Sequence, residues 1–134
     1  MQSELRPDDY VPVRRAEEEG KLTLIEGGVG PDADAFWFCL DPDQKKGDRR
    51  LAFLEKREFR QALSHAVDRE EFAHTVFLGE AVPIWGPITP GNKPWFSPNV
   101  PRYPYDLARA RELLKSIGLE DRNGNGVVET ADGV

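Results

Sequence analysis

The clearest pattern along the chain is the helical spacing of its apolar residues between about positions 51 and 77. Starting at Phe59, apolar side chains recur four, seven and eight positions later, which places them on one face of an α-helix. That face comprises Phe59, Leu63, Ala66 and Val67. Asp68 then ends this helix and caps the next, because Glu71 stands three positions later, as in a capping box. The pattern predicts two short helices that meet at Asp68.

Helix termination signals define the second of these helices and a later one. The helix after Asp68 should end at Gly79, since glycine favours the conformation that closes a helix. Its buried side chains are expected to be Phe72, Val76 and Phe77. Asp106 is predicted to cap a further helix that ends at Gly118. The apolar face of that helix comprises Leu107, Ala110, Leu113, Leu114 and Ile117.

The remaining segments are predicted to be less regular. Residues 8–19 can form a short helix despite Pro12. Alternating apolar positions predict a strand over residues 21–25, and a second strand, apolar on both faces and therefore covered, over residues 35–40. Residues 80–104 contain seven prolines and are predicted to be an extended loop that is too long for a simple connection.

Composition limits the class of protein. The chain has 134 residues, enough for one domain. Its 18 basic and 24 acidic residues give a net charge of −6 without a long block of either sign, so no nucleic-acid partner is expected. No apolar run approaches the ~18 residues of a membrane span, so no direct membrane insertion is expected. The single cysteine, Cys39, is expected to be a small buried side chain in the strand at 35–40.

Five phrases occur in the order in which one protein family has them. FRQALSHAVDRE at residues 59–70 resembles that family's RFRQALSYAIDRE, and FWFCLDP at residues 36–42 resembles its FxFNxNP strand. The other three are AVPIWGPITP (81–90), VPRYPYD (100–106) and DRNGNG (121–126). The family is extracellular solute-binding protein family 5, the peptide and nickel class of ABC-transporter substrate-binding proteins. The resemblance covers roughly residues 5–130, nearly the whole chain.

The resemblance implies an α+β fold, namely a fragment of the two-lobed periplasmic binding protein type 2 fold. Short strands, three to four helices and a long proline-rich loop are expected. Because family members are several times longer, we expect residues 1–134 to be a single internal fragment. Residues 1–50 would form the end of one lobe with its crossing strand, and residues 51–134 the helical start of the second lobe.

For the intact parent, the resemblance implies the non-catalytic substrate-binding component of an ABC importer for oligopeptides or related solutes. The solute would be enclosed between two lobes, and the partners would be an oligopeptide-like solute and an ABC permease. The expected location is periplasmic or extracellular, for instance as a membrane-anchored lipoprotein. The apolar strand and helix faces are expected to make the fragment self-associate.

The candidate ligand-binding residues are Phe36, Phe38 and Trp85. Aromatic rings provide a large contact area at low entropic cost, and these rings lie in a strand and in the long loop. The resemblance implies that the strand at 35–40 lies close to the crossing between the lobes. Core packing is the alternative; we prefer it for Phe36 and Phe38, whereas the two interpretations are evenly balanced for Trp85. Cys39 stands where the family commonly has Asn.

Residues 121–132 match a calcium-binding loop at several places. Oxygen-bearing side chains occupy places 1, 3, 5 and 12, and glycine occupies place 6. The candidate ligands are Asp121, Asn123, Asn125 and Asp132. Aspartate at place 12 is too short for bidentate coordination, and no second helix follows, so we prefer a tight acidic turn. A stand-alone structural or calcium-binding module using this loop is the alternative to solute binding, and no other cofactor is predicted.

The chain lacks a recognisable catalytic pattern. His65 and His74 are nine positions apart, without the spacing of metal ligands. No nucleophile elbow, phosphate-binding glycine loop or paired-carboxylate arrangement is present. An enzyme is therefore not expected.

Overall fold

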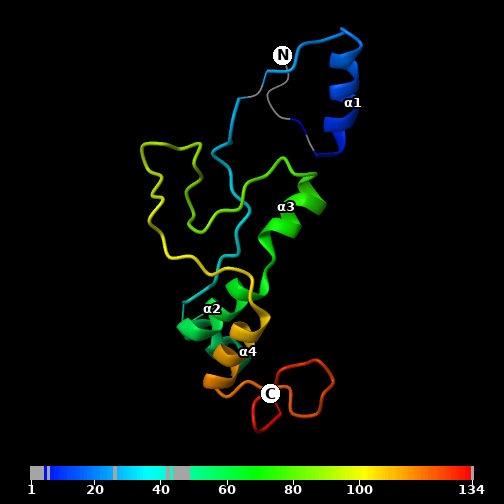
Figure 1. Cartoon of the computed structure of the whole chain (residues 1–134). Coiled ribbons are helices and arrows are strands. Elements are labelled where there is room, and N and C mark those ends of the chain that lie inside the picture. The colour runs from blue at the N-terminus through cyan, green and yellow to red at the C-terminus, as the bar shows by residue number, and fades with distance from the viewer. Residues whose placement is uncertain (1–4, 6, 26, 42, 44–48, 134) are drawn as a thin grey trace. The chain divides into compact units, whose positions relative to one another are not determined.

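The structure is a computed structural model that describes residues 5, 7–25, 27–41, 43 and 49–133. It contains α1 (Pro7–Glu18), the 3-10 helix η2 (Arg49–Glu55), α2 (Arg57–Ala66), α3 (Arg69–Phe77) and α4 (Leu107–Ser116) (Figure 1). The chain forms two compact units. The first unit comprises Met1–Asp34 and Arg69–Val100, and the second comprises Ala35–Asp68 and Pro101–Val134.

The two predicted strands are wrong. Residues 21–25 and 35–40 are neither helix nor strand, and the described part of the chain contains only an isolated antiparallel bridge between Glu120 and Glu129. A strand is stable only when its backbone N–H and C=O groups pair with a neighbouring strand. Since no described segment pairs with residues 35–40, their apolar pattern does not produce a sheet, and the α+β character predicted for the chain does not appear.

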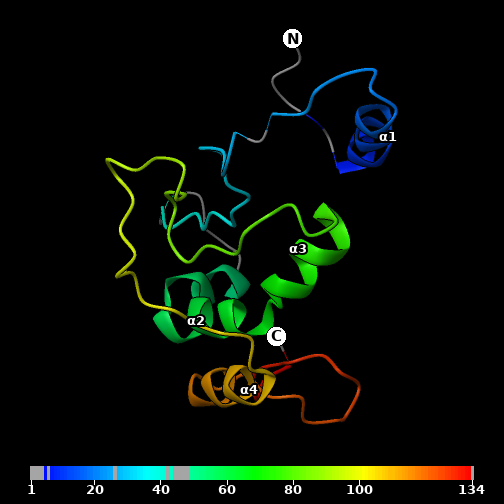
Figure 2. The same ribbon diagram turned by 45° about the horizontal axis from the view of Figure 1, so that its top comes forward.

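Helices α2 and α4 pack against each other and form the core of the second unit (Figure 1; Figure 2). Ala62 of α2 is 1% exposed and packs with Ala110 and Leu113 of α4, with Leu114 at the edge. Alanine side chains are small, so the backbones of the two helices can lie close together at this contact and still pack without clashes or gaps. The predicted helix is therefore confirmed for α4, and three residues of its predicted apolar face carry the core.

The face that α2 buries differs from the predicted one. Leu63 and Ala66 are exposed, whereas Ala62 is fully buried. Phe59 is half-buried and its ring lies 6.2 Å, between centroids, from that of Phe53 in η2. The helix thus presents its Ala62 side to α4 and its Phe59 side to η2, so two neighbours share its surface and the predicted single stripe is only partly buried.

Hydrogen bonds between residues about 40 positions apart join the end of α2 to the start of α4. The backbone N–H of Asp106 donates to the carbonyl of His65 at 2.8 Å, and His65 Nδ1 lies 2.7 Å from the carbonyl oxygen of Pro104. The Asp106 side chain accepts a bond from the N–H of Arg109 at 2.9 Å, which confirms the predicted cap. The helix closes before Gly118, which has φ +86°.

In the first unit, α1 begins at Pro7 and contains Pro12, which removes one backbone donor without ending the helix. Proline is well tolerated at the first helical position, where its missing N–H would be unpaired in any case. Asp8 and Asp9 lie in the first turn, where the helix dipole favours negative charge. The predicted helix over residues 8–19 is confirmed.

Helix α3 also confirms its predicted position but not its predicted core. It ends near Gly79, which has φ +83° and donates its N–H to the carbonyl of Ala73 at 3.1 Å. Ala73 is its buried residue, whereas Phe72 and Val76 are 48% and 46% exposed. Phe77 is half-buried, and its ring meets that of Phe72 edge-on. Phe72 and Val76 are thus only partly covered, so the apolar pattern of α3 overstates its burial.

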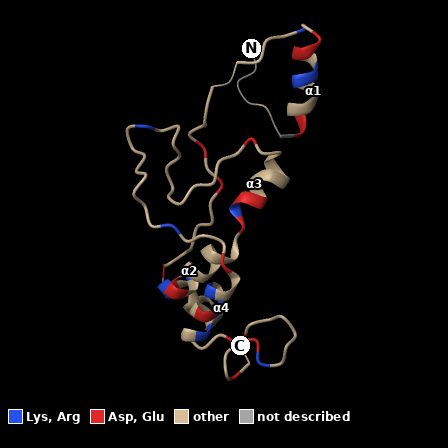
Figure 3. Ribbon diagram, in the orientation of Figure 1, with Lys and Arg blue, Asp and Glu red and all other residues tan. Residues whose placement is uncertain are grey.

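Residues 80–104 contain no helix or strand, as the prolines predict. Within the described ranges, no helix is long and apolar enough to cross a membrane. Positive and negative side chains occur together on α1, α2, α3 and α4, which agrees with the absence of a block of one charge (Figure 3).

Candidate functional site

Trp85 lies in the proline-rich loop of the first unit, and its indole ring is covered on one face. The guanidinium carbon of Arg69, the first residue of α3, lies 4.5 Å from the ring centroid. Both side chains are half-buried, and burial lowers the pKa of Arg69 from its ordinary value. A cation over the electron-rich face of tryptophan is attractive by about 0.5–2 kcal/mol. This stacking fixes Trp85 against α3, a contact that the sequence did not predict.

The same loop is held at a second point by close contact with the segment around Gly30. Thr89 is the only buried polar residue in the described part of the chain, at 2% exposed, and its hydroxyl donates to the Gly30 carbonyl at 2.6 Å. A Cβ atom at Gly91 would overlap the carbonyl oxygen of Val29 and lie 2.8 Å from that of Gly30. Gly91 is therefore required by space and not by a positive φ.

Phe36 and Phe38 belong to the second unit and do not share one environment. Phe36 is 84% exposed, as is its neighbour Trp37 at 82%, whereas Phe38 is half-buried. Core packing, which we preferred for Phe36, is therefore wrong. Cys39 is also exposed, so the prediction of a buried thiol is wrong as well. The reason is the missing strand: without a covering neighbour strand, Phe36 and Trp37 stay in solvent and Phe38 is only partly covered.

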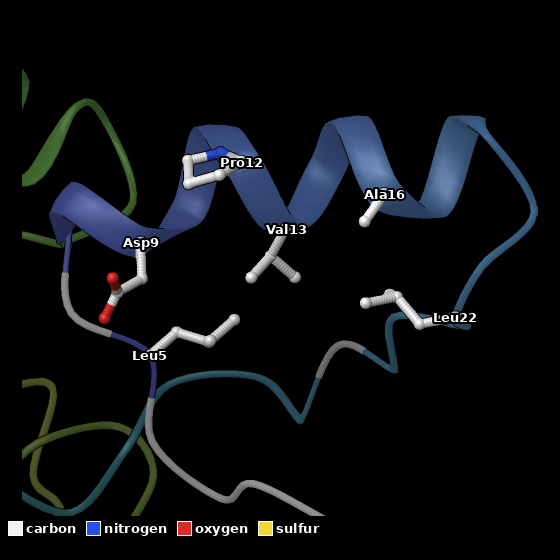
Figure 4. Close-up of a pocket in the computed structure, with 6 residues that line it drawn as sticks. All are labelled: Leu5, Asp9, Pro12, Val13, Ala16 and Leu22. Atoms are coloured by element: carbon white, nitrogen blue, oxygen red, sulfur yellow. The ribbon is translucent and has the colours of Figure 1, made fainter.

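The first unit has an open pocket of about 330 Å³ beside α1. Figure 4 shows the side chains of α1 and of the flanking segments that surround it. It is lined by Leu5, Asp9, Pro12, Val13, Ala16 and Leu22. All but Asp9 are apolar, and Leu22 is 40% exposed, so the pocket is the partly covered apolar side of α1. The sequence alone does not reveal this pocket, because its lining combines residues of α1 with Leu5 and Leu22 outside the helix.

The predicted calcium ligands at residues 121–125 lie together in a tight turn. Asp121 accepts hydrogen bonds from the backbone N–H groups of Gly124, Asn125 and Gly126 at 2.8–3.1 Å. Asn123 and Asn125 each accept the N–H two residues further on, at 3.0 and 2.8 Å. Asparagine and aspartate commonly form turns of this type without a metal.

Asp132 has a different partner from the other three candidate ligands. Its carboxylate accepts the Thr130 hydroxyl at 2.6 Å. No group of three or more His, Cys, Asp or Glu side chains with metal-binding geometry occurs in the described residues. The turn is closed by the Glu120–Glu129 bridge, with backbone bonds of 3.1 and 3.2 Å. Lys115 donates to Glu120 at 2.6 Å, and this bond, with the lysine charge, lowers the pKa of Glu120.

We expect 5 mM calcium to leave the melting temperature of the chain unchanged. The oxygens of Asp121, Asn123 and Asn125 already accept the backbone N–H groups of the turn, and a ligand that does not bind the native state cannot shift the folding equilibrium. Differential scanning calorimetry with and without calcium measures this. Magnesium at the same concentration is the control for nonspecific ionic effects. A calcium-specific increase that Asp121→Ala removes would contradict the prediction.

Comparison with known proteins identifies the family of the chain. The profile described as "Bacterial extracellular solute-binding proteins, family 5 Middle" matches residues 10–132. The periplasmic alpha-galactoside-binding protein of Rhizobium meliloti is 34% identical over 90 residues, which cover 66% of this chain and 13% of that protein. The glutathione-binding protein GsiB of Salmonella typhimurium is 37% identical over 111 residues, or 83% of this chain and 20% of that protein.

A third relative extends the range of named ligands. The oligopeptide-binding protein AppA of Bacillus subtilis is 32% identical over 79 residues, which cover 57% of this chain and 14% of that protein. No solved structure matches the chain significantly. The matched segment thus spans about 13–20% of the length of these curated relatives. Since the family profile covers nearly the whole sequence, the chain belongs to the bacterial extracellular solute-binding proteins of family 5.

Proposed function

We propose that the whole protein is the substrate-binding component of an ABC importer and that its solute is peptide-like. The observation that carries this proposal is the family match over residues 10–132. Two of the three relatives described above are named for glutathione and for oligopeptides, and glutathione is itself a tripeptide. The alpha-galactoside-binding relative is the reason to test a sugar beside a peptide.

The proposed role is non-catalytic. Relatives are named as binding proteins, and the sequence contains no nucleophile elbow, phosphate-binding glycine loop or paired-carboxylate arrangement. The proposed partners of the whole protein are an ABC permease and the solute, and the proposed location is periplasmic or extracellular. Residues 1–50 are proposed to belong to one lobe and residues 51–134 to the other. Enclosure between lobes would supply the binding energy, because such sites remove most of the ligand surface from water.

Phe36, Phe38 and Trp85 are proposed as aromatic contacts for the solute. Phe36 is exposed, and Phe38 and Trp85 are half-buried, so each retains surface that a ligand can cover. Trp85 is supported further by its stacking on Arg69, since a ring held in one orientation loses little entropy on binding. A calcium module built on residues 121–132 is the less favoured proposal, because hydrogen bonds within the turn already explain its geometry.

A segment exchange tests the proposal. The matched 111 residues of Salmonella typhimurium GsiB are replaced with the corresponding residues of this chain, and glutathione binding is measured by titration calorimetry. We expect the chimera to bind glutathione and Trp85→Ala to weaken that binding about tenfold, or ~1.4 kcal/mol. The isolated chain should give no measurable heat, because part of an enclosing cleft cannot bury a ligand.

Trp95→Ala is the matched control for Trp85→Ala. Trp95 lies in the same loop but is not one of the three proposed contacts, and we expect removal of this 76% exposed ring to change the affinity less than twofold. An α-galactoside and a tripeptide of unrelated sequence are titrated in parallel. A folded chimera that binds only the α-galactoside would contradict the peptide-like solute, and one that binds none of the three would contradict the solute-binding role of this segment.

A further inference from the structure

The loop of residues 80–100 is fixed at two places within the first unit. At one, the guanidinium of Arg69 stacks on Trp85 at 4.5 Å from the ring centroid. At the other, the hydroxyl of Thr89 donates to the carbonyl of Gly30 at 2.6 Å, and Thr89 is only 2% exposed. Only residues 86–88 separate the two contacts along the chain. A tether this short leaves Trp85 little freedom once Thr89 is fixed.

The contact at Thr89 is unusually close because of Gly91. Any side chain at position 91 would collide with backbone atoms of Val29 and Gly30, which cannot move away as the tip of a flexible side chain can. The carbonyl of Thr89 accepts the N–H of Asn92 at 3.0 Å, so residues 89–92 form a hydrogen-bonded turn. The backbone of this turn therefore lies directly on the backbone of the segment at residues 29–30.

Further backbone hydrogen bonds extend the turn to Phe96, and the residues between Trp85 and Thr89 are also restrained. The carbonyl of Asn92 accepts the N–H groups of Trp95 and Phe96, both at 3.0 Å. A Cβ at Gly86 would lie 3.3 Å from Val100, so this position is also closely packed. Pro87 has a fixed φ, which removes one more degree of freedom between Trp85 and Thr89.

We propose that Thr89 and Gly91 are positioning residues that lock the loop of residues 80–100, and with it Trp85, into one shape before any solute is present. The loop then acts as a preformed wall and not as a lid that closes on the solute. The effect on affinity rests on the proposed function. A loop that is already ordered raises the affinity for the solute, because no further entropy is lost in ordering the loop on binding. The locking itself involves only contacts within the chain.

Hydrogen–deuterium exchange of the chain without solute tests the locking. We expect the amides of Asn92, Trp95 and Phe96 to exchange at least 10-fold more slowly than in an unstructured peptide, because each donates a backbone hydrogen bond. Gly91→Ala should remove this protection across residues 85–96. Helix α4, which belongs to the second unit, should keep its protection.

The position of Trp85 is followed in a Trp37→Phe/Trp95→Phe background. We expect acrylamide quenching of the remaining tryptophan to increase at least twofold in Gly91→Ala, because the ring loses its fixed place against Arg69. Thr89→Val, which deletes the hydrogen bond to Gly30, should give a smaller increase in quenching. Thr89→Ser keeps the hydroxyl and should give the same quenching as the original chain.

Gly27→Ala is the matched control for Gly91→Ala. Gly27 is exposed, its φ is not positive and a Cβ there meets no atom within 4 Å, so we expect neither exchange nor quenching to change. Rapid exchange of the loop amides in the unmodified chain would overturn the proposal. So would unchanged exchange in Gly91→Ala, or an equal loss of protection in α4. Because no solute is used, a failed glutathione titration leaves this result intact, and the reverse also holds.

Discussion

Leu113→Ala is expected to lower the free energy of unfolding of the second unit by about 2–5 kcal/mol, the usual cost of emptying a buried leucine site. Leu113 is 7% exposed and packs with Ala62 and Ala110 in the contact between α2 and α4. Neither alanine can extend to fill the space left behind. Since small domains are stable by only ~5–15 kcal/mol, this loss removes a large part of the stability, and the variant should unfold at a lower urea concentration and a lower temperature than the original chain.

Urea denaturation followed by the helical circular dichroism signal measures this change. Leu107→Ala is the matched control, because it removes the same side chain from the same helix at a site that is 41% exposed. Alanine is the better helix former, so helix propensity does not account for a loss of stability in either variant, and a larger loss at Leu113 reports burial. We expect the control to cost less than about 1 kcal/mol. Equal losses for the two variants would mean that the α2–α4 contact does not hold the second unit together.

The helices were predictable from the sequence because their signals are local. Spacing of apolar residues, the cap at Asp106 and the glycines at 79 and 118 all act within a few positions of the backbone they affect. The strands were not predictable in the same way. A strand over residues 35–40 needs a partner from elsewhere in the chain, and the described residues supply none.

Which side of a helix is buried was less predictable than the helix itself. On α2 the pattern favoured Leu63 and Ala66, yet the buried residue is Ala62, because the positions of α4 and η2 decide which side is covered. On α3 the large residues Phe72 and Val76 stay half in solvent while Ala73 is buried. Apolar character shows which side chains gain from burial, but a neighbour must be present to bury them.

In the candidate site, too, the local features were predictable from the sequence and the contacts between distant residues were not. Trp85 was selected for its type and loop, and the structure adds the Arg69 stacking that the sequence does not reveal. Thr89 and Gly91 were missed as a contact. Thr-Pro-Gly within a proline-rich loop is a turn signal, but the need for an empty space at position 91 arises from Val29 and Gly30, about 60 residues earlier in the sequence. Turn chemistry is local, whereas close backbone approach is not.

The chain is expected to self-associate, and exposed aromatic residues are the reason. Phe36 and Trp37 are adjacent and more than 80% exposed. Two such rings offer roughly 300 Å² of surface, worth about 6–10 kcal/mol if covered. Association itself costs ~4–15 kcal/mol, so the net gain is at most about 6 kcal/mol, and weak dimers or larger assemblies with dissociation constants of roughly tens of micromolar or weaker are expected. Light scattering over a concentration series from about 10 µM to about 1 mM measures the association.

The double variant Phe36→Ser/Trp37→Ser should shift association to at least tenfold higher concentration, because it removes the largest exposed apolar surface in residues 35–40. Trp95→Ser is the matched control: it removes a similarly exposed ring, at 76%, from the loop of residues 80–100. If the two variants weaken association equally, general surface apolarity and not the segment at 35–40 drives it. An original chain that stays strictly monomeric at every concentration would contradict the prediction altogether, and would mean that the exposed rings gain too little from pairing to offset the cost of association.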